Sequence, residues 1–281
     1  MTASPSRSQS RSLGGAIPPV LLVGCGRMGG AMLAGWRERG LSASVAVDPA
    51  PTAASLAGPD LRVVAGPDGI PADFVPAAVV LAIKPQNATE TLPAYARFAS
   101  SAVFLSIMAG RTIAGIGGLL GPEAAIVRAM PNTPAAVRQG ITVACPLPGV
   151  AESQRALCDA LLQAIGTVAW VADETLLDPV TAVSGSGPAY VFLLAELMEQ
   201  AAIEQGIPPE LARQLARQTV SGSGALLAAS TEPSAELRRA VTSPGGTTER
   251  ALSVLMAADA WPDTLSRAIA AATARSRELA G

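Results

Sequence analysis

The chain contains 281 residues, of which 49% are hydrophobic and 15% charged, with a net charge of −2. This balance, without a basic stretch interleaved with aromatic residues, argues against a nucleic-acid-binding protein, and no uninterrupted apolar run of about 18 residues predicts a membrane span. The sequence has no histidine and only three, widely spaced cysteines, which argues against a disulfide framework and against metal catalysis, so we expect no metal site.

The first 16 residues are rich in serine and lack a hydrophobic core. Such a segment predicts a disordered tail and not a signal peptide. A cytoplasmic protein is therefore expected. The length suits one large domain or two moderate ones. The change of pattern after Ala172, described below, favours two, one from residue 17 to 172 and one from 173 to 281.

A glycine-rich loop follows the first predicted strand, residues 20–23, and precedes a helical run that continues through about Arg39. The loop has the pattern G-x-G-x-x-G, in which the first glycine allows a tight turn, the second lets the backbone approach a pyrophosphate, and the third lets helix and strand pack closely. The pattern therefore predicts a dinucleotide site. Its expected coenzyme contacts are Gly24, Cys25, Gly26, Arg27, Met28 and Gly29.

Asp48 ends the second predicted strand, residues 44–47. A carboxylate at this position can accept hydrogen bonds from an adenosine ribose, which favours NAD, and would repel the 2′-phosphate of NADP. Alternatively Asp48 begins a turn with Pro49, and Thr52 or a nearby arginine hosts the phosphate. The choice between NAD and NADP stays open.

Strand patterns and helical patterns alternate up to residue 172. One strand, residues 77–83, is a continuous apolar run of the kind found in buried parallel sheets. The alternation predicts a Rossmann-type, doubly wound α/β sheet of roughly eight strands. Further strands are expected at residues 61–64, 103–107, 125–128, 141–144 and 167–171, with a helix at about 150–164.

Lys84 is the only lysine in the chain and follows Ala82 and Ile83 at the end of a central strand, just before Pro85. In open α/β sheets ligands bind at the carboxyl ends of strands, so Lys84 is either a ligand contact or a solvated loop residue. Small residues and prolines end the next two strands, where they form either a floor under a nicotinamide ring or plain strand-to-helix turns. These strand ends are Ser106 to Gly110 and Met130 to Pro134.

After Ala172 only helical patterns follow, which predicts an all-α C-terminal domain. Gly185, Gly187 and Pro188 interrupt the first helix, either for close helix packing or for the approach of a ligand. The domain is too apolar for a monomeric bundle, so we expect a homo-oligomer. The predicted helical segments are about 174–205, 209–229, 233–240, 248–258 and 261–279.

The loop from Thr242 to Thr248 precedes one of these helices and concentrates hydroxyl groups, glycines and one proline. Backbone amides at a helix N-terminus, together with the helix dipole, can hold a small anion such as a carboxylate. An ordinary capped helix start after a turn is the alternative interpretation.

Five motifs together carry a resemblance to the pyrroline-5-carboxylate reductase family, in that family's order and approximate spacing. The last two are highly specific, whereas the first is shared by all Rossmann enzymes. The resemblance covers the chain from about residue 19 to the end. The motifs are Gly24 to Gly29, Ala82 to Gln86, Met130 to Pro134, Ser184 to Tyr190, and Val241 to Thr248.

The resemblance implies reduction of Δ1-pyrroline-5-carboxylate to L-proline, with hydride moving from NADPH or NADH to C5 of the cyclic imine. It implies that the Thr248 hydroxyl reaches the ring nitrogen and that Ser184 and Gly185 lie near the substrate. The imine nitrogen is already basic, so positioning and a hydrogen-bond partner suffice without a histidine. The substrate carboxylate would be held by the loop residues Ser243, Pro244, Gly245, Gly246 and Thr247, mainly through the Ser243 side chain and the amides.

For the coenzyme, the resemblance implies that the glycine-rich loop holds the pyrophosphate. It places Ala82, Ile83, Lys84 and Pro85 on the nicotinamide side and Ala109, Met130 and Pro131 beside the ring. Family members form homodimers through the helical domain, often as pentamers of dimers. Asp48 departs from members that use NADPH, which often carry small or basic residues there, so NADH use is an open alternative.

Two other functions are compatible with the layout. A 3-hydroxyacid or imine reductase of the 6-phosphogluconate-dehydrogenase-like type shares it, but the hydroxyacid enzymes place a catalytic lysine in the second domain, and no lysine follows Lys84. A nucleotide sensor without turnover would be expected to have a damaged substrate loop, whereas Thr248 and its neighbouring glycines are present.

Overall fold

The computed structural model describes residues 16–280. Apart from Ala16, the tail predicted to be disordered lies outside the described residues. The chain divides into two compact units, one ending at Leu177 and the other running from Asp178 to Leu279, and each is described by itself.

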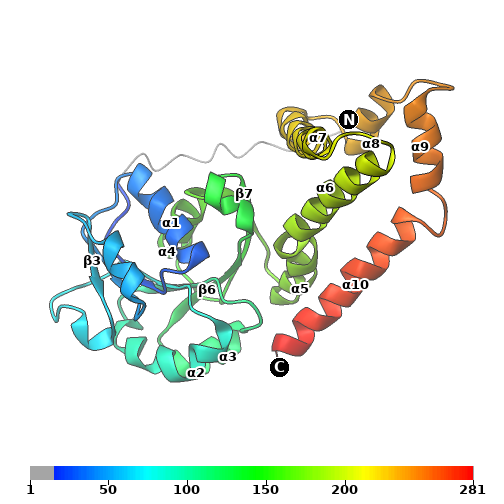
Figure 1. Cartoon of the computed structure of the whole chain (residues 1–281). Coiled ribbons are helices and arrows are strands. Elements are labelled where there is room, and N and C mark those ends of the chain that lie inside the picture. Colours follow the sequence, from blue (N-terminus) through cyan, green and yellow to red (C-terminus); the bar gives the residue numbers. More distant parts are fainter. Residues whose placement is uncertain (1–15, 281) are drawn as a thin grey trace, which may run out of the picture. The chain divides into compact units, whose positions relative to one another are not determined.

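The first unit is built on one eight-stranded sheet with the strand order β3-β2-β1-β4-β5-β6-β7-β8 (Figure 1). From β1 the chain moves outward to β2 and β3, then returns to place β4 on the other side of β1. This reversal between β1 and β4 is the switch point of a doubly wound fold, and it confirms the predicted fold class. The strands are β1 (Val20–Val23), β2 (Ser44–Val47), β3 (Leu61–Val64), β4 (Ala78–Leu81), β5 (Val103–Ser106), β6 (Ala125–Met130), β7 (Gly140–Pro146) and β8 (Gly166–Trp170).

Central strands are buried along their whole length because both faces of the sheet are covered. All four residues of β1, of β4 and of β5 are buried. On one face α1 (Arg27–Glu38) packs beside α4 (Glu152–Gln163), where Trp36 donates from Nε1 to the Leu161 carbonyl at 2.9 Å. The other face carries α2 (Ala88–Thr91), the 3₁₀ turns of Leu92–Phe98 and α3 (Ile113–Leu120).

β7 runs antiparallel to β6, whereas the other neighbouring strands of the sheet pair in parallel. Only residues 131–139 connect the two strands, with a 3₁₀ turn at Thr133–Val137. A parallel crossover needs about a dozen residues or more, so this connection is too short and the strand must reverse.

The second unit is all helical, as predicted, and its helices match the expected segments closely. The predicted interruption of the first segment is a π turn at Thr181–Gly185, after which Pro188 stands in the first turn of the resumed helix. The helices are α5 (Leu177–Val180, which spans the boundary between the units), α6 (Gly187–Glu204), α7 (Pro209–Ala229), α8 (Ser234–Ala240), α9 (Thr247–Leu255) and α10 (Trp261–Ala280).

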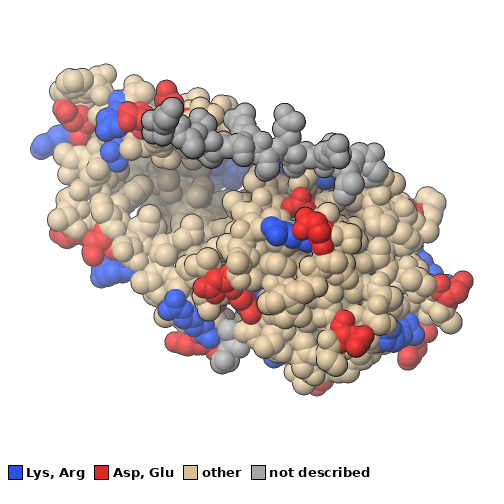
Figure 2. Space-filling view, turned by 180° about the vertical axis from the view of Figure 1, so that it is seen from behind, with Lys and Arg blue, Asp and Glu red and all other residues tan. Residues whose placement is uncertain are grey.

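Apolar side chains remain exposed over much of this helical unit. No residue of α6 is buried, and α7 buries only Ala212 and Ala216. By length and composition the stretch Glu174–Glu204 could cross a membrane, and only 6% of its most apolar 18-residue window is buried. On the molecular face shown in Figure 2, positive and negative side chains are interspersed and gather into no single-sign patch. The helices therefore present apolar surface that the described residues do not cover.

Candidate active site

Two glycines of the glycine-rich loop are required by the packing of the loop itself. Gly24 has φ +96° and donates to the Val47 carbonyl at 2.9 Å, and a Cβ on it would lie 2.7 Å from the Ala82 oxygen. A Cβ on Gly29 would lie 2.2 Å from the Gly24 oxygen. These two residues therefore fix the close contact of β1, α1 and β4.

Gly26 is different, because nothing in the fold requires it to be glycine. It caps α1 with φ −63°, and a Cβ there would meet no atom within 4 Å. The position is exposed and lies at the N-terminus of α1, where unpaired N–H groups favour an anion. The backbone at Gly26 is therefore open to the close approach of an anion.

Asp48 holds the loop from the neighbouring strand β2. Its Oδ2 accepts from the Cys25 amide at 2.6 Å and its Oδ1 from the Ala50 amide at 2.8 Å. The hydrogen bond from the Ala50 amide closes the turn expected at Asp48-Pro49. Burial, and secondarily the Asp48 charge, raises the pKa of the Cys25 thiol to about 11, which favours the protonated thiol near pH 7.

The other predicted coenzyme residues gather at the same edge of the sheet, because β1, β4, β5 and β6 run parallel and share one carboxyl edge. Lys84 is exposed there and precedes a 3₁₀ turn. Ala109 is exposed, whereas Pro131 is buried. The fold thus brings these residues together with the glycine-rich loop.

Side-chain contacts that the sequence did not reveal hold the loops at this edge. Arg111 donates from Nε to the Pro85 carbonyl at 2.9 Å, and Asn132 Oδ1 accepts from the Ile141 amide at 2.9 Å. Arg111 follows the predicted site residue Ala109 by two positions, but no local pattern indicates that its partner lies 26 residues away.

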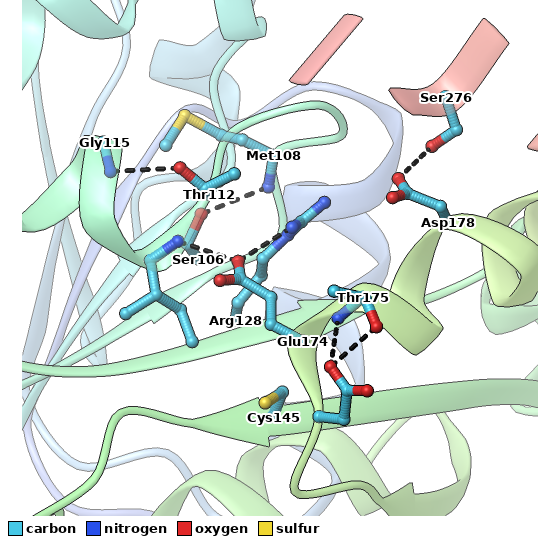
Figure 3. A network of polar contacts seen from close by, with 12 residues as sticks. Ser106, Met108, Thr112, Gly115, Arg128, Cys145, Glu174, Thr175, Asp178 and Ser276 are labelled. Carbon is cyan, nitrogen blue, oxygen red and sulfur yellow. Dashed lines mark hydrogen bonds and ion pairs between the residues drawn. The ribbon is translucent and has the colours of Figure 1, made fainter. Parts of the chain in front are cut away.

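A partly buried ion pair lies at the start of α3 (Figure 3). Glu174 Oε1 accepts from Arg128 Nη1 and from the Ile113 amide, both at 2.8 Å. Nearby, the Ser106 hydroxyl accepts from the Met108 amide at 3.3 Å. Glu174 thus connects β6 to the first turn of α3, and these contacts hold the segment that carries Ala109 on both sides.

In the helical unit, the loop before α9 forms a tight turn. The Gly246 amide donates to the Ser243 carbonyl at 3.0 Å, with Pro244 and Gly245 at the two central positions and φ +73° at Gly245. Proline followed by a residue with positive φ is the arrangement of a type II turn. Ser243 is exposed and Thr248 half-buried.

Two of the predicted carboxylate donors already donate within the chain. The Gly246 amide is used in the turn, and the Gly245 amide donates to Glu249 Oε2 at 2.7 Å. Within the described part of the chain, the first-turn amides of Thr247, Thr248 and Glu249 have no acceptor. Sequence reasoning missed Glu249, although an acidic residue in the first turn of a helix is a capping signal.

Ser184 and Gly185 lie in the π turn, on a separate element that leads into α6. The turn is closed by the Ser186 amide, which donates to the Thr181 carbonyl at 2.8 Å, and the Tyr190 hydroxyl satisfies the Ala182 carbonyl at 3.0 Å. The Ser184 hydroxyl oxygen is buried and has no hydrogen-bond partner among the described residues. Such π turns frequently occur at functional sites.

Comparison with known proteins identifies the family. Residues 174–279 match the pyrroline-5-carboxylate reductase dimerisation family, and residues 19–110 match a family of NADP oxidoreductases described as coenzyme F420-dependent. A pyrroline-5-carboxylate reductase of Pseudomonas aeruginosa is 38% identical over 94% of this chain and 97% of its own length. This chain belongs to the pyrroline-5-carboxylate reductase family.

Solved structures of pyrroline-5-carboxylate reductases share the whole fold. The protein from Coxiella burnetii gives a TM-score of 0.86 at 30% identity, covering 94% of this chain and 99% of the other. The one from Plasmodium falciparum, with NADP bound, gives 0.79 at 26% identity, covering 95% and 99%. The resemblance stated from the sequence is confirmed, and with it the assignment to nicotinamide-dependent oxidoreductases.

Among residues 16–280, no group of three or more His, Cys, Asp and Glu side chains is placed to hold a metal ion. The roles of individual residues in binding and catalysis remain predictions.

Proposed function

We propose that the chain reduces 1-pyrroline-5-carboxylate to L-proline at the residues described above. The observation that carries the proposal is the loop before α9, in which a rigid turn precedes three free first-turn amides and the Thr248 hydroxyl. The substrate has one carboxylate and one ring nitrogen, and the loop offers donors for the first and a hydroxyl for the second. The proposal is further supported by membership of the family.

The coenzyme would bind at the carboxyl edge of the sheet. The amides at the start of α1 would hold its pyrophosphate in front of Gly26, while Lys84, Pro85 and Ala109 would border the nicotinamide. When bound, the reduced nicotinamide supplies the hydride that reaches C5 of the substrate. The residues of the edge bind it, orient it and exclude water.

The substrate carboxylate would be held by the Ser243 hydroxyl and the Thr247 amide, joined by the amide of Thr248. Gly245 takes part only if the carboxylate displaces Glu249, and otherwise it shapes the turn together with Pro244 and Gly246. The Ser184 hydroxyl, buried and unpaired, is the donor that the π turn offers to the substrate.

Thr248 would act on the ring nitrogen. As the C5=N bond is reduced, its π electrons become the lone pair of the amine, while an iminium proton already present stays on the nitrogen. The Thr248 hydroxyl orients this nitrogen by a hydrogen bond, and no strong acid is needed.

We propose that Asp48 makes the coenzyme site favour NADH. Its carboxylate follows β2 and would accept hydrogen bonds from the adenosine ribose of a bound coenzyme, where it would repel a 2′-phosphate. Asp48→Ser is expected to shift the ratio of kcat/KM values toward NADPH. Because the substitution also removes the acceptor of the Cys25 amide, Asp48→Asn serves as the control that keeps an acceptor and loses the charge. An unchanged ratio in both variants would show that Asp48 does not read the ribose.

The proposed assembly is a homodimer formed through the helical unit, with pentamers of dimers as the larger form, in the cytoplasm. Its support is the match of residues 174–279 to a dimerisation family and the exposed apolar side chains of α6 and α7.

The decisive experiment follows the oxidation of NADH and of NADPH at about 340 nm with 1-pyrroline-5-carboxylate, and confirms proline as the product. Turnover is expected with at least one coenzyme. Folded protein that binds a coenzyme but yields no proline would favour another imine substrate or a nucleotide sensor.

A further inference from the structure

We propose that Arg111 is a positioning residue for hydride transfer, which locks together the two loops that border the nicotinamide. This inference rests on the proposed function, because it assumes a coenzyme at the carboxyl edge of the sheet. Strand pairing does not hold these two loops together at the point where the nicotinamide ring would lie.

The pairing of β4 with β5 ends at Leu81 and Ser106, and the last backbone hydrogen bond between the strands runs from the Ile107 amide to the Leu81 carbonyl at 3.1 Å. Beyond it the chain continues as Ala82 to Pro85 on one side and Met108 to Arg111 on the other. Within the described residues, one hydrogen bond joins these segments past Ile107, from Arg111 Nε to the Pro85 carbonyl at 2.9 Å. Arg111 therefore sets the distance between them.

The Ala109 segment is also fixed from the opposite direction. The Met108 amide donates to the Ser106 hydroxyl at 3.3 Å, and the Ile113 amide donates to Glu174 at 2.8 Å (Figure 3). With this segment anchored on the sheet, the Arg111 contact transmits its position to Pro85 and hence to Lys84. The contact is half-buried, so water competes with it less than with an exposed hydrogen bond.

Hydride transfer depends steeply on the distance between donor and acceptor, and a shift of about 1 Å can lower the rate about 100-fold. Arg111→Met removes the donor and keeps an apolar stem. We expect it to lower the single-turnover rate of hydride transfer roughly 10- to 100-fold, with a fully expressed primary isotope effect from coenzyme deuterated at C4. The KM for the imine should change much less. Arg111→Lys, which restores one donor, should recover part of the rate.

Arg39→Met is the matched control, because Arg39 also donates to backbone carbonyls, Gln163 at 2.6 Å and Ala160 at 3.4 Å, but on α1 and α4 away from the carboxyl edge. It should leave the rate and the isotope effect unchanged. A second readout needs no turnover: the fluorescence anisotropy and lifetime of bound NADH or NADPH should fall in Arg111→Met and not in Arg39→Met.

Unchanged hydride transfer and unchanged coenzyme fluorescence in Arg111→Met would overturn the inference. The inference would also be overturned if Arg111→Met and Arg39→Met lost hydride-transfer rate and thermal stability to the same extent, since that would mark a purely structural contact. If wild-type protein does not reduce the imine, the proposed function fails, and the fluorescence comparison still decides the role of Arg111.

Discussion

Gly24 and Gly26 are two positions apart in one loop, and the fold requires only Gly24 to be glycine. Gly24→Ala places a Cβ 2.7 Å from the Ala82 oxygen at φ +96°, so we expect a loss of about 1–3 kcal/mol in the free energy of unfolding. Gly26→Ala meets no atom and has a permitted φ, so stability should be unchanged or rise by about 0.4–1 kcal/mol.

Gly26→Ala should lower the coenzyme affinity although it does not lower the stability. If its role is to let the pyrophosphate approach, Gly26→Ala should weaken NADH and NADPH binding at least about tenfold, a cost of about 1.4 kcal/mol. Chemical denaturation and fluorescence titration on the same preparations measure the two quantities. A Gly26→Ala protein that binds coenzyme normally would contradict the assigned pyrophosphate site.

Thr248 is the residue on which the proposed chemistry depends most directly. Thr248→Val keeps the branched shape and removes the hydroxyl, so only a hydrogen bond to the substrate nitrogen is lost. Hydrogen bonds to charged groups contribute about 1.5–3 kcal/mol, so turnover should fall about 10- to 150-fold while coenzyme affinity stays nearly constant. Thr247→Val, at a position proposed to act through its amide, is the control and should retain most of the turnover. Loss of coenzyme binding in Thr248→Val would refute the role.

Single residues differ in how far the sequence could predict them. Gly24 and Gly29 were predictable because the glycine-rich pattern marks both positions. The Gly29 contact with Gly24 is local, whereas the Gly24 contact with Ala82 comes from β4 and is visible only in the fold. Arg111 and Glu249 were not. The partner of Arg111 depends on how β4 and β5 align, and Glu249 takes the very amide that a family-based interpretation gives to the substrate.

At the scale of elements, the Arg128–Glu174 pair holds the end of the sheet unit to the start of α3. The two side chains differ in exposure, 6% for Arg128 and 26% for Glu174. Glu174→Ala leaves a buried guanidinium without its partner and also frees the Ile113 amide, which should cost about 3–5 kcal/mol. Arg128→Met leaves a carboxylate that water can reach and that still accepts from Ile113, so it should cost clearly less.

Urea denaturation of the two single variants and the double variant measures this asymmetry. The double variant should be more stable than Glu174→Ala alone, because it no longer buries an unpaired charge. Equal losses of unfolding free energy in the two single variants would mean that water does not stabilise the unpaired Glu174 carboxylate.

The elements themselves were largely predictable, and the exceptions have physical causes. The spacing of apolar residues in the sequence reflects which side chains are buried, so it predicts the eight strands and the helices α6 to α10 within a few residues. It carries no information on the direction of β7, which follows from the short connection after β6. It also could not distinguish a π turn from a simple break at Ser184, because that depends on which carbonyl each amide reaches.

At the scale of the whole molecule, the helical unit exposes more large apolar side chains than an isolated domain would be expected to leave in water. Members of this set occur on α6, α7, α9 and α10. They include Val191, Phe192, Leu193, Leu197, Leu215, Leu226, Leu227, Val254, Trp261 and Leu265. Residues 174–279 match a dimerisation family, so the apolar surface and the family match point to the same assembly.

Phe192 tests that assembly, because it is 69% exposed on a helix without buried residues. Burying such a side chain contributes about 1.5–3 kcal/mol, and an arginine in its place would add an unpaired charge to the interface. Phe192→Arg should therefore raise the dissociation constant of the proposed dimer at least about tenfold, seen as a lower mass in light scattering after size exclusion. Val75→Arg is the matched control, since Val75 is also 69% exposed but belongs to the sheet unit. If Val75→Arg dissociates the protein and Phe192→Arg does not, the sheet unit and not the helical unit carries the interface.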